Sequence, residues 1–337
     1  MLRRLTPLMA LVVIVAAVGC SRQEPADPAA AAFEAFRAAY TDAPSRADQI
    51  AALEGFVGGY PGHPYAGYYA ADLISYYAHD LGQPETAYDK VSAVLARVED
   101  PEARLYLAAE LAPVAAELGR PVDLEPYIDA VRAQGPLAFD QLDTVMTAAG
   151  ATGDWQLALS ASEEALARAT PEAYRADYPD RDFSDEEVAE RVRRRRAAAL
   201  THHAWALYNT GAHDEAFGEF EQADELRVDS YVGVSGGPLD RLWARALLDA
   251  GQPAAALDRI TQEALFGDTA KALPVALAAY AAVEGGVDGF DAYLAKQRRD
   301  RAPILDDVTL ADYEGRQHSL NDLRRDKVLL LAFWFPT

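Results

Sequence analysis

Hydrophobic positions recur with a helical period from Phe33 to about Arg299, and no run typical of a strand interrupts them. Five glycines punctuate this pattern, and each ends one apolar-periodic stretch and precedes the next. They are Gly82, Gly119, Gly153, Gly211 and Gly251. Because glycine readily adopts the left-handed conformation that closes a helix, we expect a series of helices joined by short turns.

The residues that follow each glycine repeat one spacing. Small, large and small side chains stand five, nine and twelve residues after Gly211, as Ala216, Phe220 and Ala223. This spacing places three side chains on one face of a helix, where small residues let a neighbouring helix approach. The same offsets after the other four glycines give Ala87, Val91 and Val94; Leu124, Ile128 and Val131; Ala158, Ser162 and Ala165; and Ala256, Ile260 and Glu263.

The repeated helix pairs resemble a degenerate tetratricopeptide array. Spacings of 37, 34 and 40 residues between neighbouring glycines fit that period, whereas the gap of 58 residues contains an insertion, Tyr174 to Phe183. One helix pair cannot bury its apolar face alone, so several pairs must stack. The resemblance implies an α-α superhelix with a concave surface that binds a protein or peptide partner.

A different pattern follows in the last part of the chain. Val308 to Leu310 has the composition of a strand, Asp312 to Gly315 that of a turn, and Arg316 to Leu320 can pair back. Ser319, or an asparagine after it, can cap a short helical turn. The unbroken apolar run Val328 to Phe335 is typical of a strand buried on both faces of a sheet, which further elements must cover.

This block resembles the front of a thioredoxin-like redoxin domain. The group is that of the TlpA-like thiol-disulfide oxidoreductases and the alkyl hydroperoxide reductase and thiol-specific antioxidant proteins. The residues that match its pattern are Ala302-Pro303, Leu310, Gly315, Ser319-Leu320, Leu323, Lys327 and Phe333-Trp334. Asp326 departs from the pattern, because the family has a glycine there. The resemblance covers about a tenth of the chain.

The resemblance implies thiol-disulfide exchange by a Cys-x-x-Cys motif whose first cysteine would directly follow Thr337. A helix N-terminus there would favour the thiolate, which attacks a disulfide before a second cysteine resolves the mixed disulfide. Trp334, Phe335, Pro336 and Thr337 would shape the approach to this nucleophile. The 337 residues do not include it, so we expect the chain as given to be truncated and inactive as an oxidoreductase.

Two explanations for the missing nucleophile are open. The sequence is a fragment that ends inside the domain, or the nucleophile is a selenocysteine whose codon closed the reading frame. Two alternatives to the reductase are also open. One is a tetratricopeptide adaptor without enzymatic activity, whose redoxin end is a remnant. The other is a thiol peroxidase of the same superfamily, because the front half of the domain does not separate the two activities.

The N-terminus has the pattern of a lipoprotein signal. Arg3 and Arg4 precede an apolar stretch too short to span a bilayer, and the segment Ala17 to Cys20 resembles a bacterial lipobox. The resemblance implies cleavage before Cys20 and lipidation of its sulfur. Ser21 is not the acidic residue that retains lipoproteins in the inner membrane of familiar Gram-negative systems. We therefore expect the outer membrane of the cell envelope, facing the periplasm.

Composition narrows the list of partners. The net charge is −22, so nucleic acid and anionic membrane surfaces are poor partners by electrostatics. Cys20 is the single cysteine, which excludes an internal disulfide framework and a cysteine-based zinc site in these 337 residues. We expect no cofactor and no metal site. The partners we expect are a protein or peptide on the repeats, a disulfide substrate in a complete redoxin, and a membrane reached through the lipid.

Several clusters suggest further chemistry. Arginine 191 and arginines 193 to 196 could hold an anion, but we expect a solvated helix with Glu187 and Glu190 as i,i+4 partners and with Ser184 in a capping box. His202, His203 and His213 lack metal-ligand spacing. The segment Tyr231 to Pro238 is glycine-rich without matching a phosphate-binding loop, and we expect a long loop. Tyr68, Tyr69, Tyr76 and Tyr77 predict a stripe on one helix face, which suits packing between repeats better than a ligand groove.

The sequence therefore predicts a mainly α protein: a tetratricopeptide-like superhelix followed by the first strands of an incomplete thioredoxin-like domain. The expected segments are a signal peptide (residues 1–19), a tether (20–32), helical repeats (33–300) and the front of the redoxin domain (301–337).

Overall fold

The computed structural model describes residues 28–227, 238–301, 309–312 and 314–324. Several predictions lie outside these residues: Cys20 with its lipobox, most of the glycine-rich loop, Ala302-Pro303, and the run from Lys327 to Thr337. The chain divides into two units, residues 1–154 and 155–337, and each is described by itself. The prediction of a mainly α fold with a few strands near the end is confirmed.

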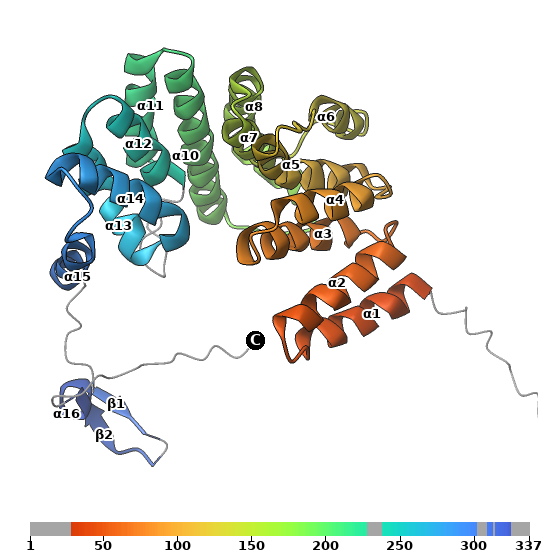
Figure 1. Cartoon of the computed structure of the whole chain (residues 1–337), viewed down its shortest axis with the longest axis horizontal. Helices are drawn as coiled ribbons and strands as arrows, with labels where there is room; N and C mark the ends of the chain where they lie inside the picture. Colours follow the sequence, from red (N-terminus) through yellow and green to blue (C-terminus); the bar gives the residue numbers. More distant parts are fainter. Residues whose placement is uncertain (1–27, 228–237, 302–308, 313, 325–337) are drawn as a thin grey trace, which may run out of the picture. The chain divides into compact units, whose positions relative to one another are not determined.

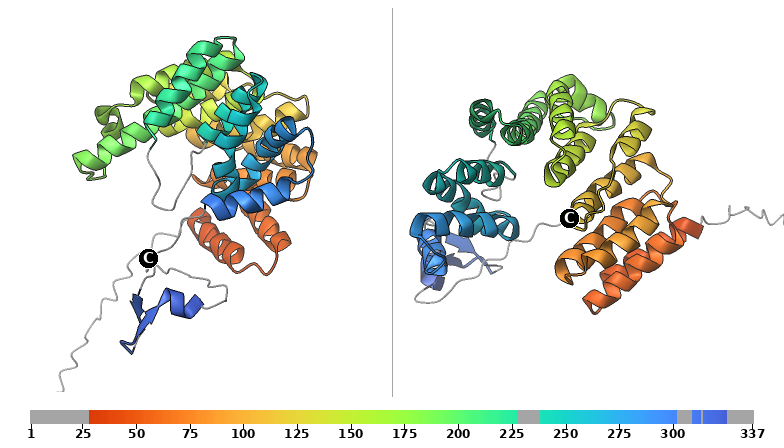
Figure 2. Two further views of the ribbon diagram at one scale, coloured as in Figure 1. Left: turned by 90° about the vertical axis from the view of Figure 1, so that its left-hand side faces the viewer. Right: turned by 45° about the horizontal axis from the view of Figure 1, so that its top comes forward.

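The described part of the first unit consists entirely of helices and turns (Figure 1). Its elements are α1 (Pro28–Thr41), α2 (Arg46–Gly59), α3 (Ala66–Ile74), a π-helical turn η1 (Ser75–Asp80), α4 (Pro84–Leu95), α5 (Pro101–Glu117), α6 (Glu125–Arg132) and α7 (Phe139–Thr152). From α1 to α6 each helix packs on its neighbours in the chain, and α3 also packs on α5, and α5 on α7. The views of Figure 2 show the same succession of helices in this unit.

Local sequence signals account for the ends of these helices. The Asp100 side chain accepts a hydrogen bond from the Ala103 amide at 2.8 Å and caps α5, and Ser45 caps α2 in the same way. The five glycines predicted to end helices all have positive φ angles, between 62° and 95°. The prediction that these five glycines end helices is therefore confirmed.

Two features organise the core of the first unit. Phe33 and Phe36 from α1 pack with Phe56 from α2 and Tyr69 from α3, which joins the first three helices. Further along the chain, Gly67 of α3 approaches Ala103 of α5 closely: a Cβ atom at Gly67 would lie 2.8 Å from the Cβ atom and from the carbonyl oxygen of Ala103. Only glycine permits this crossing without a shift of the helices.

The described elements of the second unit are α8 (Trp155–Arg168), α9 (Pro171–Asp177), α10 (Asp185–Asn209), α11 (His213–Glu225), α12 (Pro238–Asp249), α13 (Pro253–Phe266), α14 (Thr269–Glu284), α15 (Phe290–Arg301), β1 (Thr309–Ala311), β2 (Gln317–Ser319) and α16 (Leu320–Arg324). The long helix α10 packs against α8, α9, α11 and α12, and α13 packs against α12 and α14. The capping box of Ser184 and Glu187 at the start of α10 is confirmed.

The repeated spacing after the glycines marks the buried face in both units. All fifteen residues at the three offsets are buried, including Ala216, Phe220 and Ala223, which are each 0% exposed. The last of the fifteen is Glu263, also 0% exposed, so one repeat buries a carboxyl group where the others bury an apolar or small side chain.

The predicted hairpin and helical turn near the end of the chain are confirmed. Strands β1 and β2 are antiparallel, with Leu310 opposite His318, and Gly315 in the connecting turn has a φ of 80°. The Asp312 carboxylate accepts hydrogen bonds within this turn and from His318 Nε2 at 2.9 Å. Ser319 caps α16, because its hydroxyl accepts a hydrogen bond from the Asp322 amide.

Candidate functional site

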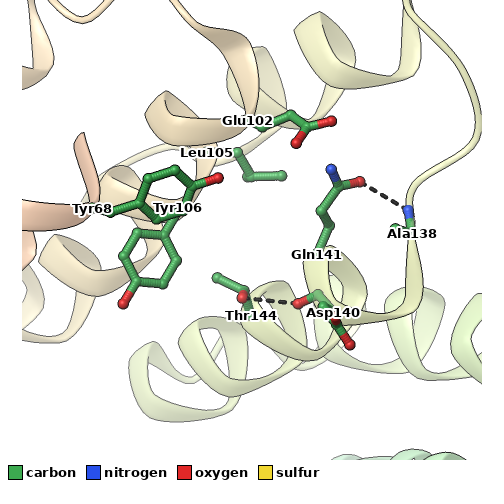
Figure 3. Close-up of a pocket in the computed structure, with 8 residues that line it drawn as sticks. All are labelled: Tyr68, Glu102, Leu105, Tyr106, Ala138, Asp140, Gln141 and Thr144. Atoms are coloured by element: carbon green, nitrogen blue, oxygen red, sulfur yellow. Dashed lines mark hydrogen bonds between the residues drawn. The ribbon is translucent and has the colours of Figure 1, made fainter. Parts of the chain in front are cut away.

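The first unit holds a pocket of about 260 Å³ between α3, α5 and the start of α7 (Figure 3). Its lining is Tyr68 from α3; Glu102, Leu105 and Tyr106 from α5; Ala138; and Asp140, Gln141 and Thr144 from α7. We call this the tyrosine pocket. Ligand pockets for whole small molecules commonly have about 300 to 1,000 Å³, so this volume suits a single side chain or a small group.

The close crossing of α3 and α5 positions the aromatic wall. Gly67 lies against Ala103, and their chain neighbours Tyr68 and Glu102 therefore reach the same pocket. The Tyr68 and Tyr106 rings pack with their centroids 5.1 Å apart and their planes tilted by 37°. Tyr68 nonetheless remains 40% exposed, so its ring offers a surface to a ligand.

The first turn of α7 forms the opposite wall. The Gln141 side-chain oxygen accepts a hydrogen bond from the Ala138 amide at 2.8 Å, which fixes the side chain at the start of the helix. Figure 3 shows the amide nitrogen of Gln141 on the side of Glu102. The Thr144 hydroxyl donates to the Asp140 carbonyl oxygen at 2.9 Å. This wall therefore consists of side chains with fixed hydrogen bonds.

Negative charge surrounds the two tyrosines. Burial raises the pKa of the Tyr68 hydroxyl, and the carboxylates of Glu102 and Asp100 raise it further. Burial also raises the pKa of Tyr106, with added contributions from Glu110, Asp72 and Tyr68. Both phenols therefore stay neutral at physiological pH and keep their hydrogen-bond donors.

This arrangement suits a positively charged group. The faces of neutral tyrosine rings attract cations, and Glu102 adds a carboxylate near Tyr68. None of the eight lining residues is a lysine or an arginine. A ligand cation would thus meet aromatic faces and carboxylates without a competing positive charge from the lining.

Comparisons with known proteins give no further assignment. No model of a known family, no curated protein and no solved structure matches the chain. The site is therefore interpreted from its own geometry.

The residues predicted to act in redox chemistry and lipidation lie outside the described residues. These are Cys20, Trp334, Phe335, Pro336 and Thr337. In the described part of the chain, no group of three or more histidine, cysteine, aspartate or glutamate side chains is arranged to hold a metal ion. Within the same residues, no helix combines the length and the apolar character needed to cross a bilayer.

The prediction of a single tyrosine stripe is confirmed only in part. Tyr69 and Tyr76 do face α1, where Tyr69 packs on Phe36 and the Tyr76 hydroxyl lies 2.5 Å from that of Tyr40. Tyr68 instead faces α5 and lines the tyrosine pocket, so the single-stripe prediction is wrong for this residue. A turn of π-helix at Ser75–Asp80 also changes the angular relation between the two tyrosine pairs, since π-helix winds more slowly than α-helix.

The arginine cluster of α10 is less solvated than predicted. The ion pair of Glu190 with Arg194 is present as expected. Arg195, however, is only 6% exposed, because the insertion after α8 folds back as α9 and places Asp177 2.7 Å from its guanidinium. Arg193 donates to the carbonyl oxygen of Leu226 at 3.0 Å. Through these contacts Arg193 and Arg195 stabilise the fold.

The three histidines near the end of α10 have separate surroundings. His203 Nδ1 lies 2.6 Å from the Glu219 carboxylate, and this hydrogen bond raises the pKa of the imidazole. His213 stacks on Tyr208 with ring centroids 4.5 Å apart, and His202 is buried. The structure does not bring them together.

Proposed function

We propose that the first unit binds a protein partner and takes up one lysine or arginine side chain of that partner in the tyrosine pocket. The observation that carries this proposal is the pairing of two neutral tyrosine rings with carboxylates around a cavity of side-chain size. The stacked helices on either side of the pocket offer the remaining contact surface, as helical repeats commonly do.

The expected strength of this contact is modest. A cation over an aromatic face contributes about 0.5 to 2 kcal/mol, and a partly exposed ion pair contributes up to about 1 kcal/mol. Because 1.4 kcal/mol is a factor of ten in affinity, the pocket contributes about twofold to a hundredfold. It therefore selects a partner side chain, and the rest of the affinity comes from the wider interface.

A pair of peptides tests the proposal. An acetylated and amidated peptide with one central arginine should bind more tightly, by calorimetry, than the same peptide with glutamine. The substitution Glu102→Gln should reduce this preference, because it removes a carboxylate beside Tyr68. Glu117→Gln is the matched control, since Glu117 is an exposed carboxylate at the other end of α5. Equal affinity for the two peptides would refute the proposal.

We further propose that the chain belongs to a redoxin-type protein. The support is the hairpin of β1 and β2 with its turn at Gly315, followed by the Ser319-capped α16, in the order that the family resemblance implies. In this proposal a cysteine or selenocysteine directly after Thr337 performs thiol-disulfide exchange on the partner that the helices hold. A non-enzymatic adaptor and a thiol peroxidase are the alternatives.

Activity measurements separate these alternatives. A polypeptide that carries the nucleophile after Thr337 should reduce a model disulfide, and serine at that position should abolish turnover. Consumption of peroxide in place of the disulfide would identify a peroxidase. If neither reaction occurs while the partner still binds to the helices, the adaptor is correct.

We also propose that the protein is anchored through a lipid on Cys20 to the outer membrane of a bacterial envelope, facing the periplasm. The lipobox-like segment before Cys20 supports this. The substitution Cys20→Ser should abolish incorporation of labelled fatty acid and release the protein into the soluble fraction. Unchanged incorporation would exclude lipidation at this residue.

A further inference from the structure

A second hollow of the first unit lies between α4, α5 and α6. It measures about 450 Å³ and is larger than the tyrosine pocket. We call it the Arg104 groove. Its lining is Tyr88, Ser92 and Leu95 from α4, with Ala96 directly after it; Arg104 and Leu111 from α5; and Pro121, Val122, Asp123, Pro126 and Tyr127 from the connection to α6 and its first turn.

Arg104 lies on the side of α5 that faces away from the tyrosine pocket. Helix positions advance by about 100° per residue, so residue 104 is about 200° from residue 102 and roughly as far from residue 106. Leu111, seven residues later, shares the face of Arg104 and also lines the groove. The groove is therefore separate from the site proposed above.

Arg104 lacks the partners that a partly buried arginine normally has. Its Nε atom is fully buried without a hydrogen-bond partner, and no carboxylate in the described part of the chain forms an ion pair with it. The guanidinium carbon of Arg104 lies 5.4 Å from the centroid of the Tyr127 ring. A buried N–H donor without a partner has lost its hydrogen bonds to water without compensation, and a ligand acceptor would restore them.

The neighbouring charges do not fill this role. Asp123 lines the groove, but its carboxylate accepts a hydrogen bond from the Glu125 amide at 3.1 Å. Asp89 is already paired with Arg120, whose guanidinium approaches the Tyr88 ring, at 3.4 Å. Arg104 is thus a cation beside a groove, with a missing anionic partner.

We propose that the Arg104 groove binds an extended peptide segment of a partner and that Arg104 receives an Asp or Glu side chain of that segment. A carboxylate matches the guanidinium in charge and can accept two parallel hydrogen bonds from it. Tyr88, Pro121 and Tyr127 offer apolar surfaces to the residues on either side of the carboxylate. The lining extends from α4 to α6, so a peptide can cross the groove and continue on both sides.

Binding of matched peptides to the full chain tests this proposal. The probe is the peptide acetyl-Pro-Leu-Glu-Leu-Pro-amide, and its match contains Gln in place of Glu. The measurement is made at 0.15 M salt, where the repulsion from the net charge of −22 is screened beyond about 8 Å. The Glu peptide should bind at least about tenfold more tightly than the Gln peptide, because a hydrogen bond from a guanidinium to a carboxylate is about twice as strong as one to a neutral amide.

Two variants separate a binding role from a structural one. Arg104→Met should abolish the preference for the Glu peptide and leave the thermal midpoint unchanged or raised, since it replaces an unpaired cation by an apolar chain of similar length. Arg120→Gln is the control, and it should keep the preference because Arg120 is already paired.

Three results would overturn the proposal. One is equal binding of the Glu and Gln peptides to the unaltered protein. Another is a lower thermal midpoint for Arg104→Met, which would show that Arg104 holds the fold together. The last is a Gln peptide with a free C-terminus that binds as tightly as the Glu peptide, because the groove would then recognise a terminal carboxylate.

Discussion

The crossing of α3 and α5 at Gly67 can be tested by one methyl group. In Gly67→Ala the added carbon would lie 2.8 Å from both the Cβ atom and the carbonyl oxygen of Ala103. Carbon atoms pack favourably at about 3.5 to 4.0 Å, so the two helices must separate by roughly 0.7 Å. The carbonyl belongs to the backbone of α5 and cannot rotate away as a flexible side chain could.

The net effect combines two opposing contributions. Forcing an extra methyl group into a packed contact costs about 1 to 3 kcal/mol. Alanine in place of glycine within a helix returns about 0.5 to 1 kcal/mol. Gly67→Ala should therefore destabilise the first unit by up to about 2.5 kcal/mol. Gly55→Ala is the matched control, because Gly55 is an exposed residue inside α2 and its added Cβ would meet no atom within 4 Å. It should stabilise the unit by about 0.5 to 1 kcal/mol.

Urea unfolding followed by circular dichroism measures both changes. Binding of the arginine peptide gives a second measure, because separating α3 from α5 moves Tyr68 away from Tyr106 and should weaken the tyrosine pocket. The control should leave peptide binding intact. If Gly67→Ala stabilises the protein as much as Gly55→Ala does, the two helices do not approach as described, and the geometry of the pocket is wrong as well.

Two further predictions concern buried carboxyl groups of the second unit. Asp240 is 2% exposed and pairs with two arginines at 2.6 and 3.0 Å, so Asp240→Asn should lower the free energy of unfolding by about 3 kcal/mol in chemical denaturation. The control Asp258→Asn, which removes an exposed partner of Arg301, should change the free energy of unfolding by less than about 1 kcal/mol. Similar losses for the two variants would contradict this account. Burial raises the pKa of Glu263, whose second carboxylate oxygen has no partner, so the charged form of Glu263 destabilises the folded state above that pKa and the protonated form does not. Glu263→Gln should therefore be more stable than the unaltered protein at pH 7, by about 1 to 3 kcal/mol. Thermal unfolding at lower pH should show this advantage shrinking, and an advantage independent of pH would refute the account.

The sequence predicts the helices and their packed faces well, because both depend on local signals. A glycine that follows an apolar-periodic stretch can end the helix with a positive φ, and the offsets after Gly211 select a face by helical geometry alone. The hairpin around Gly315 is predictable for the same reason. Local signals do not determine which helices pack together when they are distant in the sequence, and the contact of Tyr68 with Tyr106 is an example.

The tyrosine pocket was not predictable from the sequence, since it combines three segments that share no motif. The sequence predicts Tyr68 on the same face as Tyr69, although it lies against Tyr106 of another helix. Similarly, the burial of Arg195 depends on Asp177 in an insertion that has no counterpart in the repeats. A single sequence shows neither contact, because both depend on the tertiary path of the chain.

Arg104 and Glu263 each present a polar atom that is buried without a partner, but the two residues differ in what lies beside them. Glu263 is fully buried, its other oxygen accepts a hydrogen bond from the Asp268 amide, and the backbone of Gly267 lies against the carboxylate. A ligand could reach Glu263 only if the end of α13 opened, so its charge destabilises the fold and does not form a binding site. Arg104 lines an open groove, where a carboxylate can approach without any such movement. An unsatisfied buried group therefore indicates a binding site only where a cavity adjoins it, and in the described part of this chain Arg104 meets that condition whereas Glu263 does not.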